Sequence, residues 1–335
     1  MTRPFAGPVA PHLPATLGLR SFAAPGPNAA ATPDAQADWL HAQMAAAPTE
    51  VYWIDKTELA GLLPLCPAGA SRILDTHDLH SQRWPSYRQW GVSGVGAVSV
   101  AEEQALLRQF DRVICIQAED HALVSAWLGP ERALLAPHAI EAEAQTLRER
   151  ARSIGFIASR WPANADGIRW FLHTVWPRLV RPGLTLDLYG WICEAIAPLH
   201  AATPVPGLVL HGHVADLAAA YAQSDVLINP VRAGAGLKIK TVEALAYGLP
   251  LVTTTEGARG LRELDGHALR IADEPQAFAD ALQTLLASVD ARRAMGAAGA
   301  AHARRHFTRE ACYASIGQWL AAGAPATNRN PGGHP

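Results

Sequence analysis

The sequence predicts an α/β fold with two parallel sheets, and two features of the chain predict it. Short β-branched runs alternate with helical stretches, which is typical of parallel sheets with helices on both faces. A charged Glu/Arg-rich stretch from Glu141 to Ser153 divides the runs into two series, so we expect two Rossmann-like halves with ligands in a cleft beyond the strand ends. The expected strands lie at residues 51–54, 72–74, 113–116, 134–136, 154–157, 184–188, 208–210, 226–228, 251–253 and 269–271.

The predicted domains are residues 1–150, residues 151–322 and a polar, Pro- and Gly-rich tail at 323–335 that we expect to be disordered. Residues 2–33 are rich in Ala, Pro and Gly and contain no strand followed by a glycine loop. Within the first fifty residues, one helix is expected, from Asp34 to Ala47. The first sheet should therefore be short of strands and leave an edge exposed or covered in an unusual way. Residues 290–322 predict two helices with Phe307 and Trp319 as apolar anchors.

Composition excludes several classes of protein. The formal net charge of −2, without a basic stripe, argues against nucleic acid as a partner. No apolar run approaches the roughly eighteen residues that cross a bilayer, and no signal peptide is evident, so we expect a cytoplasmic protein. The four cysteines are isolated from one another, which indicates reduced core residues. The abundance of Ala and Arg over Lys suggests a bacterial origin.

The stretch from Val226 to Gly260 carries the strongest functional signal, because it reads strand, glycine loop, helix, strand and turn in immediate succession. A helix start presents unpaired backbone N–H groups and the positive end of the helix dipole, and glycine lets an anion approach closely. We therefore expect the loop amides around Gly234, Gly236 and Leu237 to bind a phosphate.

Charged residues after this loop can act with it. Lys240 and Glu243 share a helix face, whereas Lys238 points away from Lys240. This spacing directs Lys240 toward phosphate and Glu243 toward a sugar hydroxyl, and the later turn with Glu256 and Gly257 can add amides to the same ligand. Taken alone, these residues also fit a tight strand-to-helix connection with a surface ion pair.

A second polar cluster, Asp75-Thr76-His77-Asp78-Leu79-His80, follows the expected strand at 72–74. A histidine at the carboxyl end of a strand can donate to a sugar hydroxyl or a developing oxyanion, or shuttle a proton at neutral pH. We take His77 as the catalytic candidate. His77 and His80 could instead bind a metal, although no third ligand is evident, or they could buttress the loop.

These motifs closely resemble GT-B glycosyltransferases, in particular glycosyltransferase family 4 (group 1). The family signature of Glu-Ala, small and apolar residues, Gly-x-Pro and a Val-Val-like strand reads here EALAYGLPLVTT. GFIASRWPANADGIRWFLHTVWPRL is similar to the family's first C-domain strand, Pro-x-Asn loop and helix, and SRILDTHDLHSQRW to its N-terminal strand and His-Asp loop. The resemblance covers about residues 51 to 320. It implies two Rossmann-like domains, and a last helix that returns to the first of them.

The resemblance also implies further donor-binding residues. Arg160 matches loosely a basic residue directed at the donor phosphates, and Gly212 and His213 match the place where backbone groups meet the nucleobase. Arg232, just before the glycine loop, could grip phosphate through two parallel hydrogen bonds. The alternatives are solvated loop charges for both arginines and a turn-forming glycine at 212.

The chain departs from the family pattern in three places. The usual first strand and glycine loop are missing, Ala158 replaces a glycine, and Ala235 replaces the first of two glutamates, of which only Glu243 remains. The second glutamate is associated with the ribose, so nucleotide recognition should survive this change better than sugar recognition.

The resemblance implies a retaining transferase of the hexosyltransferase type, which moves a sugar from a nucleoside diphosphate sugar to a hydroxyl acceptor in polysaccharide, glycan or glycolipid synthesis. Loop amides and Lys240 would stabilise the charge growing on the diphosphate, so we expect no metal and no cofactor. A glycan or lipid-linked acceptor would allow transient contact with the inner membrane surface. Two other functions stay open: a degenerate GT-B protein that binds a nucleotide or a partner enzyme without catalysis, and a GT-B nucleotide-sugar epimerase.

Overall fold

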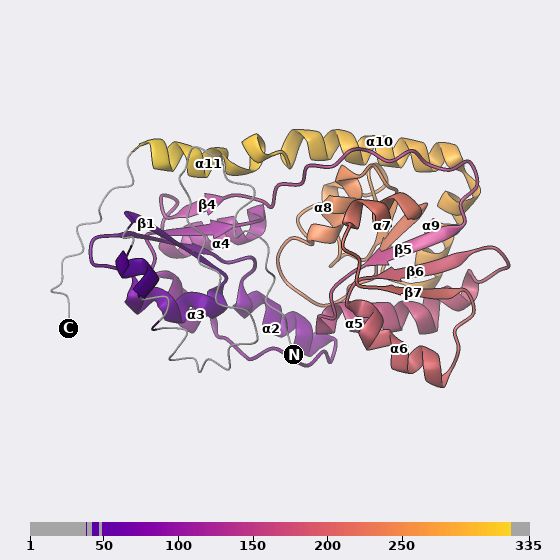
Figure 1. Cartoon of the computed structure of the whole chain (residues 1–335), viewed down its shortest axis with the longest axis horizontal. Helices are drawn as coiled ribbons and strands as arrows, with labels where there is room; N and C mark the ends of the chain where they lie inside the picture. Colours follow the sequence, from indigo (N-terminus) through magenta and orange to yellow (C-terminus); the bar gives the residue numbers. More distant parts are fainter. Residues whose placement is uncertain (1–37, 39–41, 47–48, 323–335) are drawn as a thin grey trace. The chain divides into compact units, whose positions relative to one another are not determined.

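The computed structural model describes residues 38, 42–46 and 49–322, and the chain divides into two compact units. Of the described residues, unit 1 contains those up to His77, Ala101–Pro137 and those from Cys312 on, and unit 2 contains Asp78–Val100 and His138–Ala311. Each unit is built on one parallel sheet (Figure 1). The predicted α/β class is therefore confirmed. The expectations for residues 2–33 and for the tail at 323–335 lie outside the described residues.

Unit 1 has a four-stranded parallel sheet in the order β1-β2-β3-β4. In this sheet Asp55 and Asp75, the last residues of β1 and β2, are register partners, so two carboxylates lie side by side at the carboxyl edge. Residues 42–46 are helical, within the helix predicted for 34–47. The elements are β1 (Val51–Asp55), η2 (Thr57–Leu65), β2 (Ser71–Asp75), α3 (Val100–Leu107), β3 (Arg112–Cys115), α4 (Ala118–Leu128) and β4 (Ala133–Leu135).

The last helix, α11 (Arg309–Ala321), completes the core of unit 1. Ile316 and Trp319 of this helix are buried in one cluster with Ile73 of β2 and Ile114 of β3. A helix from the far end of the chain therefore covers the first sheet, as the resemblance implied.

Unit 2 has a six-stranded parallel sheet in the order β10-β9-β8-β5-β6-β7. Every residue of β5 and β8 is buried, which explains why these strands read as continuous apolar runs. The strands are β5 (Ser153–Ile157), β6 (Thr185–Tyr189), β7 (Leu208–Gly212), β8 (Val226–Asn229), β9 (Leu251–Thr253) and β10 (Arg270–Ile271). The helices and helical turns are α2 (His80–Gln89), α5 (Pro162–Trp170), η3 (Phe171–Val175), η4 (Trp176–Arg178), α6 (Ile192–Ala202), α7 (Leu217–Gln223), α8 (Ile239–Ala246), η5 (Arg262–Leu264), α9 (Pro275–Ala287) and α10 (Val289–His306).

The strand order of unit 2 reverses beside β5. From β5 the chain runs outward through β6 and β7, and it then returns to β8 on the other side of β5 and runs outward through β9 and β10. Loops that leave the carboxyl ends of β5 and β8 consequently diverge, and such a switch point is where doubly wound sheets bind ligands.

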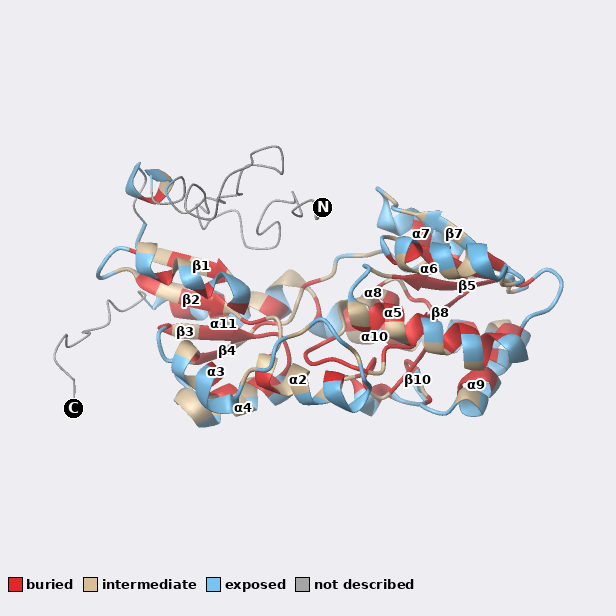
Figure 2. Ribbon diagram, turned by 90° about the horizontal axis from the view of Figure 1, so that it is seen from below, coloured by how far each residue is buried: buried red, intermediate tan, exposed pale blue. Residues whose placement is uncertain are grey.

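A large apolar core fixes this sheet between its helices. Phe171 of η3 contacts Phe278 of α9 edge to face, with ring centroids 5.7 Å apart, and both are fully buried with Trp176. Figure 2 shows the strands largely buried and the outward faces of α6 and α9 exposed. The carboxyl-end loops of the sheet are thus held by a rigid scaffold.

Helix α2 comes soon after β2 and the His77 loop in the sequence, but it packs within unit 2. Tyr87 is buried against Ala163 of α5 and against Val231 and Ala233, which follow β8. The helix therefore lies on the loops at the switch point.

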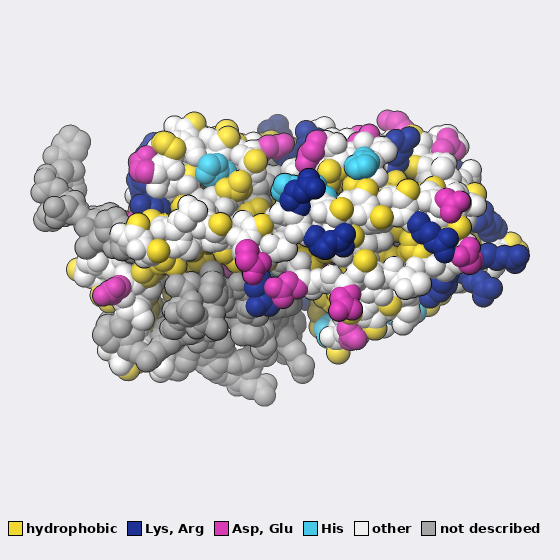
Figure 3. All heavy atoms as spheres, turned by 90° about the horizontal axis from the view of Figure 1, so that it is seen from above, with side chains coloured by type: hydrophobic (Ala, Val, Ile, Leu, Met, Phe, Trp, Pro, Cys, Tyr) yellow, Lys and Arg dark blue, Asp and Glu magenta, His cyan; other side chains and the backbone are white. Residues whose placement is uncertain are grey.

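The charges on one face and the character of the helices bear on two of the sequence expectations. On the face seen in Figure 3, Lys and Arg side chains are interspersed with acidic and apolar ones, without a continuous basic stripe. Among the residues that the structure describes, no helix is both long and apolar enough to cross a bilayer.

Candidate active site

The loop between β8 and α8 presents a row of free backbone amides. Within the described residues, the N–H groups of residues 235–240 donate to no acceptor, and the first amide that does so is that of Thr241, which bonds to the carbonyl of Lys238. Ala235, Gly236 and Leu237 are nevertheless buried. Unpaired donors in a protein-lined loop at a helix start are what a phosphate would satisfy.

Lys240 belongs to the same segment, and no carboxylate of the described residues forms an ion pair with it, although the charge of Glu243 favours its protonated form. Its ammonium Nζ donates to Asn164 Oδ1 at 2.9 Å, so it joins α8 to α5 across the switch point. Burial, with the positive charge of Lys238, lowers the pKa of Lys240 to about 8. A partly buried cation whose direct hydrogen-bond acceptor is a neutral amide oxygen can still receive an anion.

Glu243 lies one helical turn further along α8. Its Oε2 accepts a hydrogen bond of 2.7 Å from the hydroxyl of Tyr221, which stacks on Tyr247. Burial raises the pKa of Glu243 and outweighs the opposing effects of the Tyr221 hydroxyl and of Lys240. Glu243 is therefore bonded to a tyrosine hydroxyl of the protein, and its contact with a sugar hydroxyl stays a prediction.

Lys238 is turned to the other side of the loop, as its spacing predicted. Its Nζ donates to Glu256 Oε1 at 2.7 Å and to the carbonyl oxygens of Ala235 and Gly236 at 3.1 and 3.0 Å. Glu256 also accepts two hydrogen bonds from Arg259, so its carboxylate lies between two cations. The predicted donor-site residue Glu256 therefore contacts the loop through Lys238.

Two further residues of the predicted donor site are engaged in packing. The amide of Gly257 donates to Thr254 Oγ1 and its carbonyl accepts from Thr241 Oγ1, while a Cβ at 257 would lie only 2.1 Å from Thr253 Oγ1. The amide of Gly234 donates to Ser86 Oγ of α2 at 2.9 Å.

Arg232 and Arg160 both hold acidic partners. The Arg232 guanidinium bonds to both oxygens of Asp166, at 3.2 and 2.9 Å, and lies between the rings of Trp90 and Trp170. Arg160 and Glu194 form an exposed ion pair of 3.3 Å after β5.

Gly212 ends β7 and His213 follows it, next to the loop that follows β6. Gly212 has a φ of 73° and its amide donates to Cys193 Sγ. The ring of His213 lies 5.0 Å from that of Trp191, which is 44% exposed. These two open rings stand at the same sheet edge as the amide row, two and three strands from β8.

In unit 1, His77 lies over the paired ends of β1 and β2. Its Nε2 is 2.6 Å from Asp55 Oδ1 and 4.0 Å from Asp75 Oδ1, and its φ of 57° is uncommon for a residue other than glycine. Burial alone would lower the pKa of His77, but the hydrogen bond to Asp55 and the charges of Asp75 and Asp55 raise it. Burial raises the pKa of Asp75 to about 6. This donor set could hold a divalent cation, yet the hydrogen bond between His77 and Asp55 satisfies both groups without one.

The comparisons with known proteins agree with this geometry. Residues 151–288, which hold all six strands of unit 2 and the loops between them, match the family model "Glycosyl transferases group 1". This part of the chain is a group 1 glycosyl transferase domain.

Solved glycosyltransferases share the fold over most of the chain. Sucrose-phosphate synthase from Thermosynechococcus elongatus is 16% identical with a TM-score of 0.70, over 88% of this chain and 78% of that one. Anabaena HepE, in complex with UDP and glucose, is 15% identical with a TM-score of 0.64, over 86% and 81%. The pneumococcal O-GlcNAc transferase GtfA, in complex with UDP and GlcNAc, is 17% identical with a TM-score of 0.60, over 85% and 59%. The predicted GT-B fold is confirmed.

One curated protein is similar to part of this chain. An "Uncharacterized 44.6 kDa protein in cps region" of Klebsiella pneumoniae is 29% identical over 126 residues, which make up 35% of this chain and 32% of that protein. The match thus spans about a third of that relative.

Sequence reasoning about the glycosyl transferase domain missed the partners of its charged residues. Asn164 stands in the quoted Pro-x-Asn element, which was the available signal, whereas nothing local pointed to Ser86 or to the link between Lys238 and Glu256. In unit 1, Asp55 could have been found by the argument that selected His77, because it directly follows the expected strand at 51–54.

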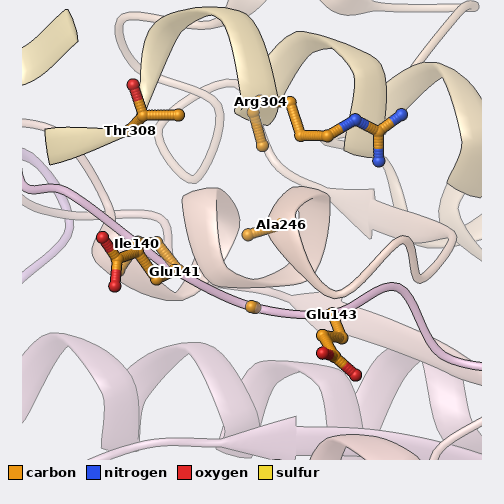
Figure 4. Close-up of a pocket in the computed structure, with 8 residues that line it drawn as sticks. Ile140, Glu141, Glu143, Ala246, Arg304 and Thr308 are labelled. Atoms are coloured by element: carbon orange, nitrogen blue, oxygen red, sulfur yellow. The ribbon is translucent and has the colours of Figure 1, made fainter. Parts of the chain in front are cut away.

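A surface pocket elsewhere in unit 2 contains none of these residues. It has a volume of about 390 Å³ and lies between residues 140–143, α8 and α10, with Glu141, Glu143 and Arg304 at its rim (Figure 4). The candidate site of the glycosyl transferase domain is therefore the loop surface at the switch point.

Proposed function

We propose that the protein transfers a sugar from a nucleoside diphosphate sugar to a hydroxyl acceptor, with retention of the anomeric configuration, in the synthesis of a polysaccharide, glycan or glycolipid. The observation that carries this proposal is a row of six amides, residues 235–240, on the same segment as the ammonium of Lys240: within the described part of the chain these amides donate to no acceptor and Lys240 forms no ion pair. Together they form a site of positive charge at a helix start. The group 1 family match and the UDP complexes of two structural neighbours agree with a diphosphate as the ligand.

Each residue has a role that follows from charge. As the bond between sugar and diphosphate breaks, negative charge grows on the phosphate, and the amides and Lys240 stabilise it in place. These groups supply the positive charge, and the proposal assigns no metal and no cofactor. Glu243 accepts a hydrogen bond from a ribose hydroxyl, in the manner that it now accepts one from Tyr221. His77 is proposed to donate a hydrogen bond to the reacting sugar or to shuttle the proton of the acceptor.

A binding-only protein is the second candidate, because Ala235 stands where relatives commonly have a glutamate at the donor sugar. Such a protein would keep the amide row, Lys240 and Glu243, and hence its affinity for nucleotide, but it would not transfer the sugar.

A screen of the full chain against UDP-, GDP-, ADP- and dTDP-sugars tests the proposal, since binding to the native state raises the unfolding temperature. Stabilisation with release of nucleoside diphosphate, and a retained anomer in the NMR spectrum of the product, is the expected result. Lys240→Met should lower turnover about a hundredfold or more, as the loss of one oxyanion-stabilising donor does, with the unfolding temperature unchanged or raised. Stabilisation without release, even with glycan or lipid-linked acceptors, would favour the binding-only protein. No response to any of the four nucleotides would contradict both.

A further inference from the structure

Lys238 makes an unusual set of contacts for a lysine next to a phosphate-binding loop. All three donors of its ammonium are used inside the protein: one by Glu256 and two by the carbonyl oxygens of Ala235 and Gly236. Its side chain is only 11% exposed. An ammonium has three donors, so Lys238 has none left for a ligand.

These contacts act on the loop backbone. Consecutive carbonyls that bond to one cation are drawn toward the same side, and the amides of the same loop then have no acceptor within the described residues. Residues 235–240 carry that row of amides, and their carbonyls at 235 and 236 are the two that Lys238 holds. Lys238 therefore occupies the loop's carbonyl oxygens at 235 and 236 and leaves its backbone N–H groups free for a ligand.

Glu256 fixes the position of Lys238. Its carboxylate is 10% exposed and lies between Lys238 and Arg259, with contacts of 2.7 Å to each. The two charged groups lie directly on Gly234, where an added Cβ would be 3.0 Å from Lys238 Nζ and 3.2 Å from Glu256 Oε1. This close approach explains why a glycine stands at 234, because the ion pair would have to shift to make room for a side chain.

We propose that Lys238, held by Glu256, is a positioning residue that orients the amides of the glycine loop toward the donor diphosphate. The inference rests on the proposed function of the loop as a diphosphate site. It assigns different tasks to two lysines two residues apart: Lys240 contacts the ligand, and Lys238 shapes the backbone that contacts it.

The other role for Lys238 is that of a direct phosphate ligand, and the two roles predict opposite effects of Glu256→Gln. If Lys238 orients the loop, weakening its anchor lets the carbonyls turn and nucleotide binding falls. If Lys238 binds phosphate itself, removing its competing carboxylate frees the ammonium and binding stays equal or tightens. The sign of the change distinguishes the roles.

The experiment is titration calorimetry of the full chain with whichever of UDP, GDP, ADP and dTDP the unaltered protein binds most tightly. We expect Glu256→Gln and Lys238→Met each to raise the Kd about tenfold or more, the loss expected for a hydrogen bond to a charged group. Their double variant should be little worse than either single one, because both changes break the same link. Lys238→Arg should regain part of the affinity, since a guanidinium can still bridge carboxylate and carbonyls.

Glu256→Asp is measured in parallel, because it keeps the charge and is the milder change if Glu256→Gln folds poorly. Its shorter side chain should still raise the Kd by drawing Lys238 off the carbonyls. Glu263→Gln, an exposed carboxylate nearby in sequence, is the matched control and should bind as the unaltered chain does. Equal or tighter binding by Glu256→Gln or, where that variant does not fold, by Glu256→Asp would overturn the positioning role while leaving the proposed function intact. Failure of the unaltered chain to bind any of the four nucleotides would overturn both.

Discussion

Lys240 gives the proposed donor site a pH dependence of its own. The folded protein holds the pKa of Lys240 at about 8, below the ordinary value of 10.5 for lysine. Between these values the folded state binds fewer protons than the unfolded chain, so this residue makes the free energy of unfolding rise with pH. Nucleotide affinity should fall over the same range, because a neutral amine no longer attracts phosphate. Titration calorimetry and urea unfolding between pH 7 and 9.5 measure the two slopes.

The control for this prediction is Lys240→Met, which should remove the pH dependence of affinity above pH 7 and the matching rise in stability. The phosphate groups of the nucleotide are already ionised there, since their second pKa is about 6. Nucleotide binding by the unaltered chain that is constant from pH 7 to 9.5 would contradict the role of Lys240.

At the residue scale, the sequence predicted that neighbouring side chains point in different directions, but it did not predict their partners. Lys238 and Lys240 do turn to different partners, but Lys238 lies before the helix as its N-cap, with extended backbone angles, so helical rotation accounts for Lys240 alone. The partners could not be predicted, because Asn164 lies 76 residues from Lys240 and is brought to it only by the return of the chain to β8 beside β5.

At the element scale, the contact of α8 with α10 depends on two glycines. An added Cβ on Gly296 of α10 would lie 2.0 Å from the carbonyl oxygen of Gly248, which ends α8 with a φ of 65°. Gly296→Ala should therefore destabilise the protein by about 1–3 kcal/mol or more, the usual cost of overpacking. Thermal unfolding followed by circular dichroism should show a midpoint lowered by several degrees.

Gly317→Ala on α11 is the matched substitution, because nothing lies within 4 Å of an added Cβ at this second helical glycine. It should stabilise by about 0.5–1 kcal/mol through helix propensity alone. Equal effects of the two substitutions would show that close packing of α10 on α8 does not set the stability.

The strands were the most predictable elements, since all ten expected runs overlap the strands of the structure. A β-branched run between turn residues fixes a strand through local chemistry. The place of α2 was not predictable in this way. Its position on unit 2 depends on Tyr87 meeting Ala163 and Val231, and on Ser86 meeting Gly234, contacts that join distant parts of the chain.

At the scale of the whole molecule, the proposed donor residues are far apart in sequence but follow one edge of one sheet. All strands of unit 2 are parallel, so the loops after their carboxyl ends open on the same side, and the turns before their amino ends open on the opposite side. A bound nucleoside diphosphate should therefore slow amide hydrogen exchange at the first edge alone. The loops concerned are residues 158–164, 211–213, 230–240 and 254–259, and the opposite turns are 181–184, 203–207, 224–225 and 249–250.

The size of this effect follows from mass action. At a nucleotide concentration of 100 times the Kd, binding adds about 2.7 kcal/mol to the free energy of any local opening that destroys the site. Exchange through that opening then slows about a hundredfold. Residues 235–240 should respond most strongly, because their amides have no acceptor among the described residues until the ligand supplies one. Mass-spectrometric exchange with and without nucleotide resolves these peptides. Protection of the opposite turns without the carboxyl-end loops would place the ligand elsewhere on unit 2, and it would remove the reason for assigning Lys240 and Glu243 to the donor.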